Sequence, residues 1–221
     1  MGACIAMNFG VVYNALPYLL SAAWSTVWIS CLGMILGQVL GALICVCRLS
    51  GSPLIDRLGG LYVSFFRGVP LLIQLLFIYD FLPLVDINVP PLVAAIAALG
   101  LASGAYVSEI YRGALNGVPR GQVESALSLG FPTLAIWRHI LLPQALRLSI
   151  PALVSELILL LKASSLISVV GVAELTRVSQ TISATNYRPL EMYLAAGVIY
   201  LIINGLIAGL GALVERRFRW A

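Results

Sequence analysis

Three stretches of the chain, residues 11–47, 87–108 and 192–214, contain no charged residue at all. Each reaches the roughly 20 residues that a helix needs to cross the hydrocarbon core of a bilayer. The stretches are continuously apolar, whereas strands of a membrane barrel alternate apolar and polar residues over about 10 positions. Helices satisfy their backbone hydrogen bonds internally, as a membrane span requires. The sequence therefore predicts an all-α integral membrane protein.

Two further stretches are apolar but carry charges. Residues 68–85 contain Asp80 as their only charge, and residues 148–173 contain only Glu156 and Lys162. With 61% hydrophobic and 10% charged residues, and a mean hydropathy of +1.01, the composition supports counting both as spans. We predict one transmembrane domain, residues 1–221, with five spans at about 17–47, 58–83, 87–115, 144–170 and 190–214 and a cytoplasmic loop at 116–143.

The basic residues indicate an orientation. Ten of the thirteen Lys and Arg residues lie in three arms, 48–67, 109–147 and 215–221. By the positive-inside rule these arms are cytoplasmic, which places the N-terminus outside and the C-terminus in the cytoplasm. Five spans agree with ends on opposite sides. The net charge of +4 is then a topology signal, and no nucleic-acid partner is expected.

Glycines recur at four-residue spacing in the first and last spans. They are Gly33, Gly37 and Gly41, and then Gly205 and Gly209. Small residues at this spacing let helix backbones approach closely. We expect tight helix packing at these positions, within one subunit or between subunits.

The loop between the third and fourth spans carries a short helix pattern. Gly and Pro at 117–121 interrupt the preceding helix, an amphipathic segment follows at 122–129, and Gly130 stands where a C-terminal cap would lie. A helix of about two turns is too short to be stable alone in water, so it must pack on something. A helix resting on lipid would favour Lys and Arg on its polar face. The polar residues here are Gln122, Glu124, Ser125 and Ser128.

A protein surface is therefore the favoured partner of this helix. Pro132 opens a second segment, which Pro143 is expected to close.

The loop resembles a known signature. Glu124-Ser125-Ala126, three residues, Gly130, nine residues and then Ile140-Leu141-Leu142-Pro143 is similar to the loop of bacterial ATP-binding cassette importer permeases, normally Glu-Ala-Ala, Gly and Ile-x-Leu-Pro at this spacing. Ser125 replaces the first Ala, and Pro132 stands one position early. Residues 67–74 and 161–169 resemble segments of the polar amino acid branch of that family, which includes histidine-, glutamine- and cystine-type permeases.

The resemblance implies a type I importer permease, multi-pass in the bacterial inner membrane, which works by alternating access. Its expected partners are a second permease, identical or homologous, two cytoplasmic ATP-binding subunits, a periplasmic or lipid-anchored solute-binding protein, an amino acid substrate and membrane lipid. The short helix would be the coupling helix that docks on the ATPase. The coupling residues so implied are Gln122, Glu124, Ser125, Ala126 and Gly130.

The chain lacks the residues of an ATPase or hydrolase. Its only lysine, Lys162, follows a run of leucines and so does not belong to a phosphate-binding loop, and its only histidine is His139. The four cysteines, from Cys4 to Cys47, have no nearby histidine or carboxylate that would complete a metal site. We expect a transport subunit that is not an enzyme, with no metal and no cofactor of its own, because ATP and Mg would bind the partner ATPase.

Charges inside a membrane are costly, so Glu156 and Lys162 are candidates for the substrate path. Their six-residue separation means about 120° of rotation and about 9 Å of rise, so they pair poorly with each other. An acidic and a basic group would match the ammonium and carboxylate of an amino acid; alternatively, each holds neighbouring helices together. Further path candidates, for which the same alternative stands, are Gln74, Asp80, Ser164, Ser165 and Asn204.

Other functions stay open at this stage. The same type of importer could carry another small solute, such as an opine or a quaternary amine. An ion-coupled secondary carrier would show broken helices and charged ion sites at mid-membrane instead of a docking loop. A scaffold without a path would leave Glu156 and Lys162 unexplained.

Overall fold

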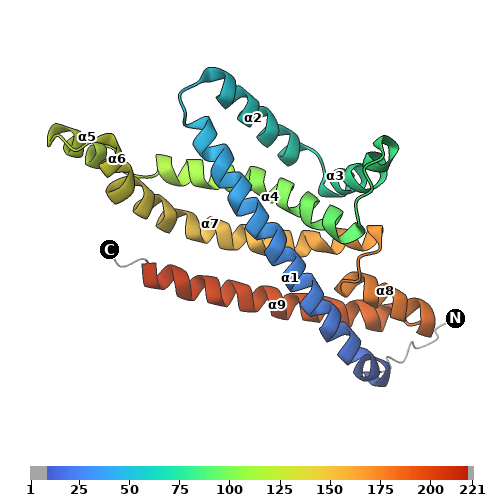
Figure 1. Ribbon diagram of the computed structural model, residues 1–221. Helices are drawn as coiled ribbons and strands as arrows, with labels where there is room; N and C mark the ends of the chain where they lie inside the picture. Colours follow the sequence, from blue (N-terminus) through green and yellow to red (C-terminus); the bar gives the residue numbers. More distant parts are fainter. Residues whose placement is uncertain (1–8, 219–221) are drawn as a thin grey trace.

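The computed structural model describes residues 9–218, so that Cys4 and the last residues of the C-terminal arm lie outside the described part. All the regular secondary structure in these residues is helical (Figure 1). The elements are α1 (Phe9–Arg48), α2 (Pro53–Gly68), α3 (Leu71–Leu76), the π-turn η1 (Phe77–Phe81), the 3₁₀ turn η2 (Leu82–Val85), α4 (Pro91–Asn116), α5 (Arg120–Ser128), α6 (Thr133–Ile136), the π-turn η3 (Trp137–Leu141), α7 (Leu142–Ala163), the 3₁₀ turn η4 (Ser164–Val170), α8 (Leu175–Asn186) and α9 (Pro189–Phe218).

Four of these helical stretches are long and apolar enough to cross a membrane, and a bent pair makes up to five. They are Gly10–Arg48, Pro91–Asn116, Thr133–Val170 and Pro189–Arg217, with the pair Pro53–Gly68 and Leu71–Val85. The predicted all-helical membrane fold is confirmed.

The bent pair occupies the region where the sequence predicts a second span. Its two parts meet at 106°, because a residue before proline is disfavoured in a helix and Val69 is extended ahead of Pro70 (φ −95°, ψ 131°). The side-chain amide of Gln74 donates to the carbonyls of Phe66 and Val69 at 2.9 and 2.8 Å. Gln74 therefore satisfies two carbonyls that the end of α2 leaves free.

The helix of the fourth span begins well before Pro143. The segments α6, η3 and α7 follow one another without interruption, so the expectation that Pro143 closes the loop segment is wrong. The Leu142 N–H bonds the Trp137 carbonyl, five residues back, which is the wide turn of a π-bulge. Such a bulge redirects the hydrogen bonds next to a proline and lets the helix continue.

The centre of the bundle is the crossing of α1 and α4, and the glycines of the first span explain it. A Cβ added to Gly37 would lie 2.7 Å from the Ser103 Cβ, and one at Gly33 would lie 2.8 Å from the Leu99 Cβ. On α4, Gly100 leaves room for the side chain of Leu36, since a Cβ added to it would lie 2.4 Å from the Leu36 Cδ2. The close packing predicted from the glycine spacing therefore occurs within this subunit.

The glycines of the last span behave differently. Gly205 and Gly209 have no atoms of the described residues within 4 Å of an added Cβ. Most of the large apolar side chains of α9 on this side are exposed, including Leu201 and Leu206. This face of α9 is left for lipid or for another chain.

Candidate functional site

The loop helix α5 lies at the end of the molecule opposite α3 and α8 (Figure 1). It ends in a Schellman motif. Gly130 has a φ of +78°, its N–H bonds the Leu127 carbonyl at 2.9 Å, and the Phe131 N–H bonds the Ala126 carbonyl at 3.1 Å. Glycine adopts this left-handed conformation without steric cost, which is the reason for its place here. Gly130 therefore forms the C-terminal cap that the sequence predicts at this position.

The two faces of α5 differ. Ala126 is buried, whereas Glu124 and Ser125 are exposed, and the Glu124 carboxylate has no ion pair within residues 9–218. The Gln122 side-chain oxygen accepts a hydrogen bond from the Gln144 amide at 2.6 Å. Of the five residues predicted to couple, two are therefore free at the surface, while Gln122 and Ala126 hold α5 to its own subunit.

A groove of about 560 Å³ separates α5 from α6 and η3. Its lining includes Ser125, Phe131 and the only histidine, His139. Around it stand large exposed apolar side chains, namely Leu127, Leu129, Phe131 and Leu134. Exposed apolar residues beside a short polar helix are typical of a surface that another protein covers.

The arms at this same end hold a charge network that sequence reasoning missed. Arg48, the last residue of α1, is paired with Glu109 of α4 and with Asp56 of α2, the latter at 3.0 Å. Arg112 also pairs with Glu109. A Cβ on Gly59 would lie 2.5 Å from the Arg48 Cγ, so glycine lets the arginine cross α2. Opposite charges at the ends of neighbouring predicted spans were the signal available for this network.

Glu156 lies inside the bundle. It is 6% exposed, on α7, and its carboxylate lies near the Ser103 hydroxyl of α4. The same hydroxyl lies 3.6 Å from the Met34 sulfur of α1. Glu156 is thus placed where three helices meet.

Lys162, by contrast, is exposed on the far part of α7 and forms no ion pair among the described residues. The structure does not bring Glu156 and Lys162 together. Their six-residue spacing puts one carboxylate in the interior and the ammonium on a surface, as the helical rotation requires. On the same face of α7 the apolar Leu159 is 56% exposed.

The other path candidates form mostly local hydrogen bonds. Ser164 and Ser165 donate to the carbonyls three residues back, at 2.7 and 2.8 Å, and the Asn204 amide donates to the Tyr200 carbonyl at 2.7 Å. The buried side-chain oxygens of Gln74 and Asn204 have no partner among the described residues. Asp80 is exposed in η1. These groups are spread over α3, η1, η4 and α9, and do not form one cluster.

A buried carboxylate that the sequence did not single out lies at the other end. Glu174 is fully buried and caps α8, accepting from the backbone N–H groups of Thr176 and Arg177 at 2.9 and 2.7 Å. The Tyr200 hydroxyl of α9 donates to it at 2.9 Å. Burial raises the pKa of the Glu174 carboxyl above its ordinary value, although these hydrogen bonds oppose the rise. A carboxylate directly before a helical segment was the available signal.

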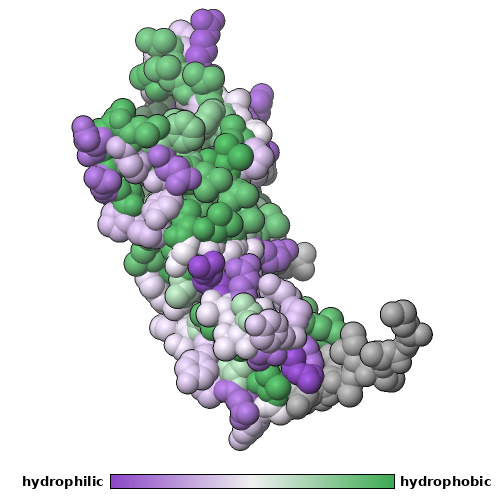
Figure 2. Space-filling view, turned by 90° about the vertical axis from the view of Figure 1, so that its right-hand side faces the viewer, coloured by the Kyte–Doolittle hydropathy of each residue, from purple (hydrophilic) through white to green (hydrophobic). Residues whose placement is uncertain are grey.

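Thr26 of α1 joins this arrangement by accepting the Leu175 N–H at 3.1 Å. Below it, Leu19, Leu175 and Met192 are fully buried in a small core of α1, α8 and α9. Figure 2 views this end of the molecule and shows polar residues over the lower part, the level at which Figure 1 places α8, with hydrophobic residues above. No group of three or more His, Cys, Asp or Glu residues that could hold a metal ion is found among residues 9–218.

These features define an integral membrane protein that carries an exposed short helix, held to its own subunit by Gln144, at one end. The chain matches, over residues 29–220, the family described as binding-protein-dependent transport system inner membrane component, and it belongs to this family. It is therefore an inner-membrane permease subunit of a transport system, and the resemblance carried by the loop is confirmed.

Two relatives cover nearly the whole chain. The glutamine transport system permease protein GlnP of Escherichia coli (strain K12) is 37% identical over 214 residues, which are 96% of this chain and 98% of that protein. The arginine transport system permease protein ArtQ of Bacillus subtilis (strain 168) is 35% identical over 214 residues, with the same shares.

Solved structures agree with the fold. A crystal structure of an amino acid ABC transporter with histidines matches with a TM-score of 0.92 at 34% identity, and covers 96% of this chain and 100% of that chain. The inward-facing MetNI methionine ABC transporter matches with a TM-score of 0.80 at 24% identity, over 93% and 98% of the two chains. The fold is that of the type I importer permeases predicted from the sequence.

Proposed function

We propose that this chain is the permease subunit of an ATP-driven amino acid importer, with α5 as its coupling helix. The observation that carries the proposal is the geometry of α5, a short helix at one end of the bundle with Glu124 and Ser125 exposed. The substrate class is supported by the relatives named for glutamine and arginine transport. ATP and Mg bind to the partner ATPase, and this chain contributes the substrate path and the coupling helix.

The coupling surface consists of Glu124, Ser125 and the exposed apolar side chains beside them. An ATPase that holds this surface pulls on α5, and the hydrogen bond from Gln144 to Gln122 passes the movement to the base of α7. Because α6, η3 and α7 are continuous, the movement reaches Glu156 and Lys162 without a flexible joint. Gly130 ends α5 so that the chain can turn back into α6.

Lys162 is the group best placed to line the path. An exposed ammonium within a membrane-spanning stretch is costly against lipid, so its face must meet water or a polar partner. A path between this permease and a second one provides both. There Lys162 would attract the carboxylate of an amino acid. Glu156, buried about 9 Å away along α7, would contact the ammonium group or fix α7 to α4.

Gln74 joins α2 to α3, whereas Ser164 and Asn204 bond within their own stretches of chain. These hydrogen bonds favour structural roles, and we propose no substrate contact for the three residues. Ser165 lies beside Lys162 and remains in the proposed path. Asp80, exposed at the end that carries α3, would lie at its outer mouth.

The assembly that follows has two permeases, identical or homologous, two cytoplasmic ATP-binding subunits and an external solute-binding protein. The basic residues of the three arms support, by the positive-inside rule, a cytoplasmic α5 and an N-terminus outside. Closure of the ATPases would rock the two permeases and open the path outward, and hydrolysis would reset it inward.

The test is ATP-dependent uptake of a panel of labelled amino acids into proteoliposomes that contain the permease with its ATPase and binding protein. Glu156→Gln and Lys162→Gln are compared with Leu159→Met, a change on the exposed face of the same helix. We expect lost or altered substrate preference in the Lys162 variant and normal uptake in the Leu159 variant. Absence of uptake for every amino acid, in a complex whose ATPase is docked and active, would overturn the proposed function.

A further inference from the structure

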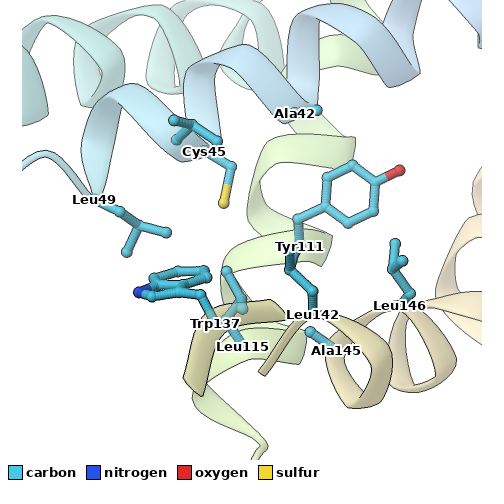
Figure 3. A pocket seen from close by; sticks show the side chains of 10 residues that line it. Ala42, Cys45, Leu49, Tyr111, Leu115, Trp137, Leu142, Ala145 and Leu146 are labelled. Carbon is cyan, nitrogen blue, oxygen red and sulfur yellow. The ribbon is translucent and has the colours of Figure 1, made fainter. Parts of the chain in front are cut away.

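A second cavity lies near the inner ends of α1 and α4, where Arg48 and Asn116 end these helices. Its volume is about 180 Å³. Figure 3 shows the Cys45 sulfur and the Leu49 side chain above the ring of Trp137, with Tyr111 beside them. Its lining side chains are almost all apolar, and the Tyr111 hydroxyl is engaged by Gln38.

The walls of this cavity come from two groups of helical elements. Cys45 belongs to α1, Leu49 follows the end of that helix and Tyr111 belongs to α4, whereas Trp137 belongs to η3, the π-bulge between the coupling loop and α7. Leu146, on the first turns of α7, completes the wall. A molecule in the cavity would therefore contact α1 and α4 on one side and η3 and α7, which follow the coupling loop, on the other.

The rim of the cavity is exposed and apolar. Val46 is 69% exposed, and Leu142 and Leu146 are 46% and 55% exposed. In a membrane-spanning chain such side chains lie against lipid, and an apolar hollow that opens beside them excludes water. An apolar cavity of about 150 Å³ holds a molecule the size of benzene. A volume of 180 Å³ thus has room for a short stretch of hydrocarbon chain.

Two exposed arginines stand next in the sequence to residues that line the cavity. Arg138 directly follows Trp137, and Arg147 directly follows Leu146; both arginines are exposed and neither forms an ion pair within the described residues. Basic residues at the cytoplasmic boundary attract anionic lipids, at about 1 kcal/mol per residue near the surface. The two arginines are nine positions apart, about 13 Å along a helix, so a single headgroup would meet one of them. Either one fits the headgroup of a lipid whose chain enters the cavity.

We propose that this cavity binds an acyl chain of an anionic phospholipid from the cytoplasmic leaflet, with the headgroup at Arg138 or Arg147. The bound chain fills the space between Trp137 and α1 and steadies the coupling segment against the bundle. This site is separate from the proposed substrate path.

The test uses the intact transporter complex in liposomes of phosphatidylethanolamine and phosphatidylglycerol, with a trace of phosphatidylglycerol that carries a diazirine in its acyl chain. After illumination, peptide mass spectrometry locates the label. We expect labelling of residues 42–49 and 137–146, and weaker labelling when the diazirine lipid is phosphatidylethanolamine. In the variant Arg138→Gln with Arg147→Gln this headgroup preference should disappear.

Ala42→Phe fills the mouth of the cavity from an exposed position, so the fold should tolerate it, and Ala145→Leu fills it from within. Both should remove the label from these peptides, whereas Ala208→Phe on the exposed face of α9, the matched control, should leave it unchanged. The proposal is overturned if Ala42→Phe labels like wild type, or if both lipids label these peptides equally in the wild type.

Discussion

The side-chain amide of Gln144, at the base of α7, donates a 2.6 Å hydrogen bond to the side-chain oxygen of Gln122 on α5. The two residues are 22 positions apart, and the same amide also reaches the Ile140 carbonyl at 3.0 Å. This bond joins the exposed loop helix to the helix that holds Glu156 and Lys162. It is therefore a direct polar connection between the proposed coupling surface and the proposed substrate path.

Removing that bond should weaken the mechanical connection between α5 and α7. We expect Gln122→Ala to lower the amount of substrate moved per ATP hydrolysed, because a net hydrogen bond contributes about 0.5–1.5 kcal/mol and α5 has little else to hold it. The measurement is the ratio of uptake to ATP hydrolysis in proteoliposomes. Gln122→Ala with Gln144→Ala should be no worse than either single change, while simple addition of the two losses would show that the bond does not act as a unit. Ser128→Ala, which loses only a bond within α5, is the control.

Reversing the charge on α5 should separate hydrolysis from transport. Glu124 is exposed and unpaired within the described residues, so Glu124→Arg should leave the bundle intact but change the charge of the proposed coupling surface. We expect ATP hydrolysis to continue with little uptake, or the ATPase to dissociate during purification. Normal transport by this variant would contradict the coupling role of Glu124.

The turn after α5 should not tolerate a side chain. Gly130 has a φ of +78°, a left-handed conformation that costs other residues about 1–2 kcal/mol. We expect Gly130→Ala to weaken ATPase binding by up to about tenfold, the factor that corresponds to 1.4 kcal/mol. Copurification and a binding titration measure this. Gly121→Ala on the same loop meets no atoms within 4 Å and has no positive φ, so equal losses in both variants would argue against the conformational explanation.

Crowding the α1–α4 crossing should destabilise the subunit. A Cβ on Gly37 would lie 2.7 Å from the Ser103 Cβ and Oγ, so the helices must separate. We expect Gly37→Ala to cost about 1–3 kcal/mol, typical of an overpacked core, and to lower the midpoint of thermal unfolding in detergent. Gly205→Ala, also in a span but facing open space, should leave the midpoint unchanged. A larger loss for Gly205→Ala would place the critical contact on α9.

The cap of α8 should make stability depend on pH. Burial raises the pKa of Glu174 in the folded protein, so the folded state holds this proton more tightly than the unfolded state. Its contribution to stability is present below the ordinary carboxyl pKa of about 4.3 and is lost as the pH rises through the higher folded value. Thermal unfolding of wild type and Glu174→Gln, followed from pH 4 upward, should show wild type losing stability relative to the variant. Parallel curves would contradict this account.

Much of the fold follows from local sequence. The uncharged runs predict α1, α4 and α9, since only helices of that length satisfy their backbone in lipid. Gly and Pro at 117–121 and Gly130 predict the bounds of α5 to within two residues, because these residue types act on their own stretch of chain. The continuation of the helix through Pro143 was not predictable in this way. It depends on a π-bulge, which local propensity does not indicate.

By itself, the sequence determined the membrane environment, the helical class, the family and the presence of a short loop helix, because hydropathy, turn residues and motif spacing are properties of neighbouring residues. Only the tertiary structure decided that Gly37 meets Ser103, that Glu156 is buried while Lys162 is exposed, and that Gln144 holds Gln122. The reason is physical. A side chain's environment is set by the helices that cross it, and the crossing of α1 and α4 joins residues more than 60 positions apart.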